Sequence, residues 1–423
     1  MENNIFELQY AMDTFYFLVC GALVMWMAAG FSMLEAGLVR SKNTTEILTK
    51  NVALFAVSCI MYMVMGYAIM YGGSYFLNGI EGGETLVADA LKDMAGREDG
   101  FGGGAVYSSA SDFFFQVVFV ATAMSIVSGA VAERMKLWAF LLFAVVMTGV
   151  IYPLEGNWTW GGGSVFGLYS LADYGFSDFA GSGIVHMAGA AAALAGVLLL
   201  GARKGKYGPN GEVRAIPGAN LPLATLGTFI LWMGWFGFNG GSQLAMGSVG
   251  DVADISRIFS NTNAAAAGGA IATLILTQVM YKKPDLTMIL NGALAGLVSI
   301  TAEPLTPSLG AATLIGAVGG VIVVFAVPML DRMKIDDVVG AIPVHLLSGI
   351  WGTIAVVFTN EDASLAVQIQ SIIIVGAFVV ITSSVMWFLL KATLGIRVEE
   401  EDEINGLDMA ELGMEAYPEF SRR

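Results

Sequence analysis

Two histidines, His186 and His345, are the residues of this sequence most able to do chemistry, and both stand in long apolar stretches. An ionisable side chain in such a stretch indicates a functional site, although a histidine bonded to a neighbouring helix is the plain structural alternative. A neutral imidazole offers one donor and one acceptor, so two adjacent rings could hand on a small polar molecule. Cysteine or carboxylate ligands do not accompany them at that depth, and we therefore expect no metal.

The two histidines end matching nine-residue segments. Asp178–His186 reads DFAGSGIVH and Asp337–His345 reads DVVGAIPVH, so both follow the pattern D-x-x-G-x-x-x-V-H. Each aspartate can cap the first turn of a helix, which is its structural explanation. Asp178 would in addition favour a cation near one mouth of a pore. The match predicts an internal repeat with the histidines at equivalent positions.

Composition places these segments in a membrane. The chain has 423 residues, of which 56% are hydrophobic and 13% charged, with a formal net charge of −15 and a mean hydropathy of +0.71. Soluble domains carry about 25% charged residues, and long uncharged stretches suit membrane-crossing helices. A soluble enzyme, a nucleic-acid binder and a disulfide scaffold are therefore excluded.

Eleven apolar segments predict an all-α, multi-pass protein of the cell (inner or plasma) membrane. Basic residues gather in the loops after every odd-numbered segment, so the positive-inside rule places the N-terminus outside and the C-terminus inside. The segment cores lie at 11–39, 52–73, 113–131, 137–152, 179–200, 221–238, 264–281, 286–301, 309–330, 338–358 and 365–394.

The histidine segments open the fifth helix of each of two halves, 11–200 and 221–358. Because five is odd, the second half must cross the membrane in the opposite sense, as in transporters with inverted repeats and a site at the midplane. Each histidine lies roughly 12 Å along a helix from its aspartate, and the two approach from opposite faces of a core about 30 Å thick. We expect the two rings to meet near the centre.

Two parts lie outside the repeats. A long eleventh helix over about 365–396 completes a membrane domain of residues 1–396, and an acidic cytoplasmic tail covers 397–423. The EEEDE run at 399–403 is typical of a solvated stretch. Glu35, near the inner end of the first segment, we expect to pair with a base or to lie at a subunit contact.

Aromatic side chains gather at the predicted outer ends of several segments. Phe115 and Phe119 are four residues apart and share a helix face, Phe238 and Ser242 end the sixth segment, and Trp160 follows the fourth. An aromatic belt at the membrane surface is the structural explanation. The functional one is a cage whose ring faces attract a small cation while the serine hydroxyl replaces a lost water.

Several motifs together resemble those of the ammonium transporter family (Amt/Mep/Rh). Besides the two histidine segments they are GLVRSKN at 37–43, GAVAER at 129–134, WGGG at 160–163, GWFGFNGGS at 234–242, NTNAA at 261–265 and GLDMAELGMEAY at 406–417. The resemblance runs from about residue 11 to 417, and it is stronger to the bacterial and archaeal Amt branch than to the Rh branch.

The resemblance implies a role for each candidate residue. The roles are an outer ammonium site for Trp160, Phe119, Ser242 and Asp178, a stacked gate for Phe119 and Phe238, a pore for His186 and His345, and secondary positions for Phe115, Gln116 and Asp337. Ammonium would lose its proton at the outer site, and ammonia would cross the apolar pore, with the proton following separately.

The resemblance also implies partners. Family members form homotrimers, and many bind a PII-type regulator at the cytoplasmic face; methylammonium is the usual substrate analogue. We expect no cofactor, no enzymatic activity and no nucleic-acid partner. The alternatives are an ammonium sensor with little transport, which the short tail disfavours, and an electroneutral Rh-like ammonia channel. Trp160 argues against that channel, because a gas pathway needs no cation cage.

Overall fold

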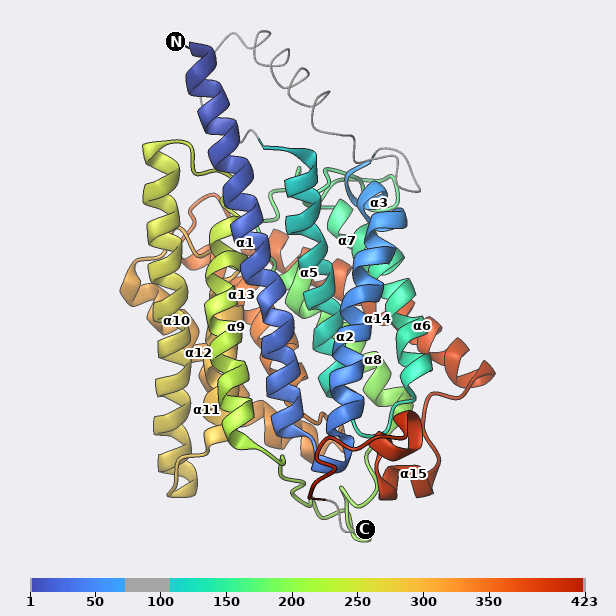
Figure 1. Cartoon of the computed structure of the whole chain (residues 1–423). Helices are drawn as coiled ribbons and strands as arrows, with labels where there is room; N and C mark the ends of the chain where they lie inside the picture. Colours follow the sequence, from blue (N-terminus) through green and yellow to red (C-terminus); the bar gives the residue numbers. More distant parts are fainter. Residues whose placement is uncertain (1, 73–106, 421–423) are drawn as a thin grey trace.

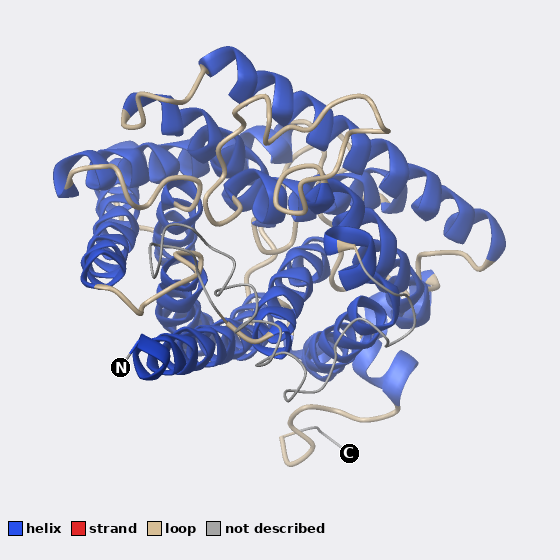
Figure 2. Cartoon of the chain, turned by 90° about the horizontal axis from the view of Figure 1, so that it is seen from above, coloured by secondary structure: helices blue, strands red, loops and turns tan. Residues whose placement is uncertain are grey.

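The computed structural model describes residues 2–72 and 107–420, and the regular structure there is helical apart from three isolated β-bridges. The long helices lie side by side and run between two opposite ends of the molecule (Figure 1). Viewed from above, helices and the loops between them make up the described chain (Figure 2). Following the predicted orientation, we call the end where α1 begins the outer end and the end with the tail the inner end.

The described residues of the first half form five helical stretches, three of which include a π-helical turn. The stretches are α1 Glu2–Leu38; η1 Ser41–Asn43 with α2 Thr44–Met61, η2 Tyr62–Gly66 and α3 Tyr67–Tyr71; α5 Ser109–Ala130; α6 Leu137–Val146 with η3 Met147–Ile151 and α7 Tyr152–Asn157; and η4 Ser182–Met187 with α8 Ala188–Leu200.

The second half repeats this number of stretches and adds an eleventh helix and the tail. The stretches are α9 Leu221–Gly241; α10 Val249–Tyr281; α11 Leu286–Ile300; α12 Leu309–Arg332; η5 Ile342–Leu347 with α13 Ser348–Ala355 and η6 Val356–Phe358; α14 Leu365–Thr393; and, in the tail, α15 Glu400–Asn405 and η7 Asp408–Leu412.

The predicted class, an all-helical membrane protein, is confirmed. Nine helical stretches of the described residues are long and apolar enough to cross a membrane, and two shorter apolar helices fall on the predicted eighth and tenth segments. The clearest difference is α10, which begins at Val249 instead of near residue 264. Ser248 and Asp251 form a capping box there, and the polar first turns that follow hide this start from a hydropathy pattern.

Helices α1 and α9 approach so closely that glycine is required at their contact. A Cβ atom on Gly37 would lie within 2.4 Å of the backbone nitrogen of Ala224, and one on Gly227 within 2.3 Å of that of Leu34. In a membrane, small residues at such contacts let backbones pack directly against each other. This contact joins the first helix of each half.

Helices α5 and α8 form the centre of the molecule. Of their most apolar windows, 83% is buried inside the chain, against 22% for the window of α14. The outward faces of α14 and α10 carry large exposed apolar side chains such as Ile373, Phe388 and Ile275, as expected for surfaces that meet lipid or another subunit. A site on α5 and α8 is therefore enclosed by other helices.

The acidic run of the tail is only partly solvated, which corrects the prediction for 399–403. Glu399, Glu400 and Glu401 are exposed, but Glu403 is 1% exposed. Its Oε2 lies 2.7 Å from Nη2 of Arg397, and its Oε1 accepts the backbone N–H of Lys204 at 2.6 Å. A local charge pattern does not reveal partners that lie nearly two hundred residues away.

Candidate functional site

The helix that carries His186 begins with a turn wrapped around Asp178. Oδ1 of Asp178 accepts the backbone N–H groups of Gly181 and Ser182 at 3.1 and 2.8 Å, and Oδ2 accepts those of the next two residues at 2.9 and 2.8 Å. Gly181 has a φ of +107°, a conformation that a side chain would strain. One carboxylate thus satisfies four N–H groups that a helix start leaves without partners.

The helix that carries His345 begins in the same way. Oδ1 of Asp337 accepts the N–H of Gly340 at 3.1 Å, and Oδ2 accepts that of Ile342 at 2.7 Å. Gly340 has a φ of +82°. The capping expected of both aspartates is therefore present. Each histidine follows its cap within the π-helical turn, η4 or η5, that opens the helix.

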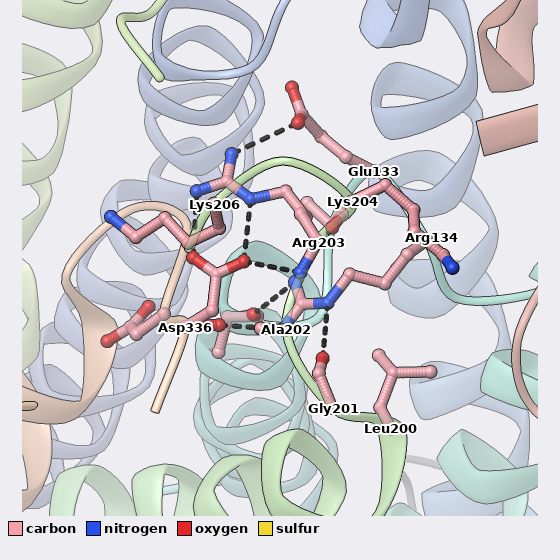
Figure 3. Close-up of polar contacts among 12 residues, drawn as sticks. Glu133, Arg134, Leu200, Gly201, Ala202, Arg203, Lys204, Lys206 and Asp336 are labelled. Carbon is pink, nitrogen blue, oxygen red and sulfur yellow. Dashed lines mark hydrogen bonds and ion pairs between the residues drawn. The ribbon is translucent and has the colours of Figure 1, made fainter. Parts of the chain in front are cut away.

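Charged side chains at the inner end fix the start of η5 against the first half of the chain. Nε and Nη2 of Arg203 bind the two carboxylate oxygens of Asp336 at 2.9 Å each, and Nη1 binds Oε2 of Glu133 at 3.0 Å. Arg134 donates from Nη2 to the backbone oxygen of Asp336 at 2.6 Å. Figure 3 shows the guanidinium of Arg203 between Glu133 and Asp336. This network holds the residue next to Asp337.

Burial and ion pairing change the pKa values of the two acids of this network, Asp336 and Glu133, in opposite directions. Burial would raise the pKa of Asp336, but the hydrogen bonds and charge of Arg203 outweigh it and hold the pKa below its usual range. Burial also opposes ionisation of Glu133, while the charge of Arg203 and the hydrogen bonds of Arg40 lower its pKa. Both acids are therefore ionised at neutral pH.

The two histidine rings meet in the centre of the molecule, as the sequence predicted. The Nδ1 atoms of His186 and His345 lie 3.2 Å apart, and the ring centroids lie 5.1 Å apart at an interplanar angle of 22°. Both side chains are buried, and His186 stacks on Trp235 with centroids 4.8 Å apart. One Nδ1 must donate to the other, so the pair behaves as one hydrogen-bonded unit.

Two stacked phenylalanines lie beside the histidine pair on its outer side. The rings of Phe119 and Phe238 have centroids 4.1 Å apart at 28°, and the ring of Phe238 lies 5.3 Å from that of His186. Both rings are almost fully buried. They come from α5 and α9 and separate the histidines from the outer surface.

Beyond the phenylalanines lies a pocket of about 370 Å³. Trp160 stands edge-on to Phe119 with centroids 6.3 Å apart, and the hydroxyl of Ser242 donates to the backbone oxygen of Phe238 at 2.9 Å, which leaves the hydroxyl oxygen free to accept. The predicted residues that line the pocket are Phe115, Gln116, Phe119, Trp160 and Ser242.

Asp178 lies beneath this pocket and does not line it. The indole N–H of Trp160 donates to the backbone oxygen of Asp178 at 3.1 Å, so the turn that caps η4 also fixes the indole. Both oxygens of the Asp178 carboxylate accept hydrogen bonds from backbone N–H groups. Asp178 therefore positions Trp160 and His186 at the same time.

Six residues that line the outer pocket were not predicted from the sequence: the polar Tyr67, Tyr71, Tyr107 and Asp112, and the apolar Phe179 and Leu244. The hydroxyl of Tyr67 donates to Oδ2 of Asp112 at 2.5 Å. Asp112 directly precedes the FFFQ run of α5, so its position was a usable signal. Tyr67 and Tyr71 are the first and last residues of α3, and Tyr107 precedes α5. None of the three carries a local sign of where its side chain points.

Glu35 makes neither of the two contacts predicted for it, with a base or with another subunit. Its carboxylate is 1% exposed and accepts from the Ser128 hydroxyl at 2.6 Å and from Nδ2 of Asn51 at 2.7 Å. It therefore lies inside the chain, bound to two neutral groups and to no base among the described residues. The nearest base, Lys50, pairs with Glu46 at 2.8 Å instead.

The fold and this site define a multi-span membrane protein in which an outer pocket, two stacked phenylalanines and a buried histidine pair follow one another. The chain belongs to the Ammonium Transporter Family, whose model matches residues 15–417. It is a family of transporters and not of enzymes, which agrees with the resemblance seen in the motifs.

Individual proteins agree with the family match. Ammonium transporter Amt2 of Archaeoglobus fulgidus is 42% identical over 434 residues, which cover 96% of this chain and 88% of that protein. A solved structure described as "Sensor Amt Protein" is 32% identical, with a TM-score of 0.84 over 97% of this chain and 100% of that one. Candida albicans Mep2 is 25% identical, with a TM-score of 0.80 over 98% and 92% of the two chains.

Proposed function

We propose that this chain conducts ammonia from ammonium captured at its outer pocket. Ammonium sheds water between Trp160, Phe119 and Ser242, where ring faces and a hydroxyl oxygen replace the lost hydration. It gives up its proton near Asp178, and neutral ammonia passes Phe119 and Phe238. The observation that carries the proposal is the succession of outer pocket, stacked phenylalanines and histidine pair along one line of contacts.

The histidine pair then holds ammonia by hydrogen bonds. Because each neutral imidazole has one donor and one acceptor, the pair can accept from N–H and donate to the nitrogen lone pair. The proton released outside follows by a separate route, so transport is electrogenic. Asp337 caps the second histidine helix, and Phe115 and Gln116 shape the outer pocket.

A current measurement tests the function. Proteoliposomes on a solid-supported membrane receive an ammonium pulse, with wild type compared with His186→Ala. We expect a wild-type current that falls to background in the variant, because the ring that receives ammonia is lost. Phe325→Leu, on the exposed face of α12, is the matched control and should keep its current. A His186→Ala protein with wild-type current would overturn the pore assignment.

An ammonium sensor with little transport is the second candidate, favoured by the similarity to the structure described as a sensor. The same measurement separates the two. A folded wild type that binds ammonium but carries no current and moves no ammonia, read by internal pH, indicates a sensor. Internal alkalinisation without current indicates an electroneutral, Rh-like channel.

We further propose a homotrimer of inverted five-helix halves with its N-terminus outside and its C-terminus inside. The family resemblance supports the trimer, and the matching starts of η4 and η5 support the repeat. A PII-type regulator would bind at the inner face, where the described part of the tail, 397–420, contacts the inner loops. Methylammonium would serve as substrate analogue.

A further inference from the structure

A small cavity on the inner side of the histidine pair contains one carboxyl group. The cavity is lined by His345 of η5 and by Glu35, with apolar neighbours such as Phe31 and Ile126. Its volume of about 10 Å³ is close to what one water-sized molecule needs, and ammonia is of that size. The cavity is thus the space next to His345 on the inner side.

The cavity shares part of its lining with a wider pocket. Asn291, Val339 and Gly340 line both it and that wider pocket of about 410 Å³. Arg203, Lys206 and Asp337 also line that wider pocket. Glu35 thus lines the cavity that lies between His345 and the residues shared with the wider pocket.

The carboxyl group of Glu35 keeps hydrogen-bonding capacity after its structural contacts are made. Each oxygen accepts one hydrogen bond, from Ser128 or Asn51, whereas a carboxylate offers about four acceptor sites. Other charged groups near it are Lys50 and Glu46 on α2, which pair with each other. Glu35 is therefore held in place without being neutralised by a base.

We propose that Glu35 exchanges a proton with ammonia on the inner side of the histidine pair. The acid form donates its proton to the nitrogen lone pair, so an N–H bond forms as the O–H bond breaks. The carboxylate holds the resulting ammonium until it leaves through the wider pocket, and then regains a proton from hydronium entering by the same pocket. This inference rests on the proposed function, because it takes ammonia to be the molecule that leaves His345.

Three variants separate proton exchange from a purely structural role. Glu35→Gln keeps an oxygen that can accept from Ser128 or Asn51 but cannot exchange a proton. Glu35→Asp keeps the acid. Ser128→Ala removes one brace of the carboxyl group and leaves the acid, so it is the matched control. Ammonium-pulse currents are recorded with internal buffers on the acid and alkaline sides of neutrality.

We expect the wild-type current to depend on internal pH, and the current of Glu35→Gln to fall about a hundredfold and lose that dependence, as for loss of a general acid. Glu35→Asp and Ser128→Ala should keep the dependence. If Glu35→Gln responds to internal pH like wild type, or if Ser128→Ala loses the response as well, the inference is wrong. A wild type without current overturns the proposed function, and this inference with it.

Discussion

Trp160 is the residue whose replacement isolates capture from conduction. Its indole meets Phe119 edge-on, but it touches neither histidine ring among the described ring contacts. Trp160→Leu removes a cation–π partner that contributes about 1 kcal/mol or more. We expect the methylammonium concentration for half-maximal current to rise about fivefold to tenfold, since 1.4 kcal/mol is a factor of ten.

A second tryptophan supplies the control for that measurement. Trp138 on α6 is 74% exposed, so Trp138→Leu changes an indole that faces the surroundings of the chain. The methylammonium concentration for half-maximal current should be the same for this variant as for wild type. Equal half-saturation for Trp160→Leu and wild type would mean that the outer pocket does not use this indole to bind the cation.

At the same scale, the repeated D-x-x-G-x-x-x-V-H pattern was enough to predict that His186 and His345 meet. The period of the helix and the thickness of the membrane fix how deep each ring lies. The tyrosines of the outer pocket, and the partners of Glu35, could not be predicted. Which way Tyr71 or Glu35 points depends on helix rotation in a bundle where nearly every face is apolar.

Among the elements, hydropathy located each membrane segment but not each helix start. Helix α10 begins in a polar stretch. Helix η4 begins directly after Gly181, whose positive φ changes the direction of the backbone. Such starts depend on capping contacts between side chain and backbone. The pairing of α1 with α9 was also beyond the sequence, because glycines are spread through most segments.

The contact between the inner loops and η5 makes a testable contribution to stability. Asp336 is 1% exposed and binds Arg203 through both carboxylate oxygens. Asp336→Asn leaves a buried guanidinium with only Glu133 as a charged partner, which should cost about 3 kcal/mol. We expect a lower melting temperature in detergent. Lys204→Gln, which breaks the exposed pair with Glu400, should change it little.

The same network sets a pH limit. The pKa values of Asp336 and Glu133 are lowered in the folded chain from ordinary values of 3.8 and 4.5. An acid whose pKa is lowered by folding stabilises the folded chain. This contribution is fully present above the acid's ordinary pKa and is lost as the pH falls toward its pKa in the folded chain. The melting temperature of wild type should therefore drop below about pH 4.5, and Asp336→Asn should drop less. Parallel curves would contradict this assignment.

Across the whole molecule, the tail joins parts of the chain that are far apart in sequence. Oδ1 of Asp408 accepts the N–H of Glu46 at the start of α2 at 2.8 Å, and Oε2 of Glu411 accepts that of Leu137 at the start of α6 at 3.0 Å. Acidic side chains favour helix N-termini, whose N–H groups lack partners. The sequence shows the acidic residues but not which helix they bind, since every helix N-terminus has N–H groups without partners.

Removing both carboxylates should release the tail. A hydrogen bond to a charged group contributes about 1.5 kcal/mol, so Asp408→Ala with Glu411→Ala should raise the population of the undocked tail about a hundredfold. When the tail docks again faster than it is cut, the cleavage rate follows the undocked population. A glutamate-specific protease should therefore cut within 399–415 about a hundredfold faster. Cleavage is measured as release of a C-terminal fluorescent tag from vesicles whose inner face points outward. Glu419→Ala, at an exposed position, should cut at the wild-type rate. If the double variant is also cut at the wild-type rate, the contacts of the tail residue Glu403 with Lys204 and Lys42 suffice to hold the tail. The two helix-start contacts then contribute little.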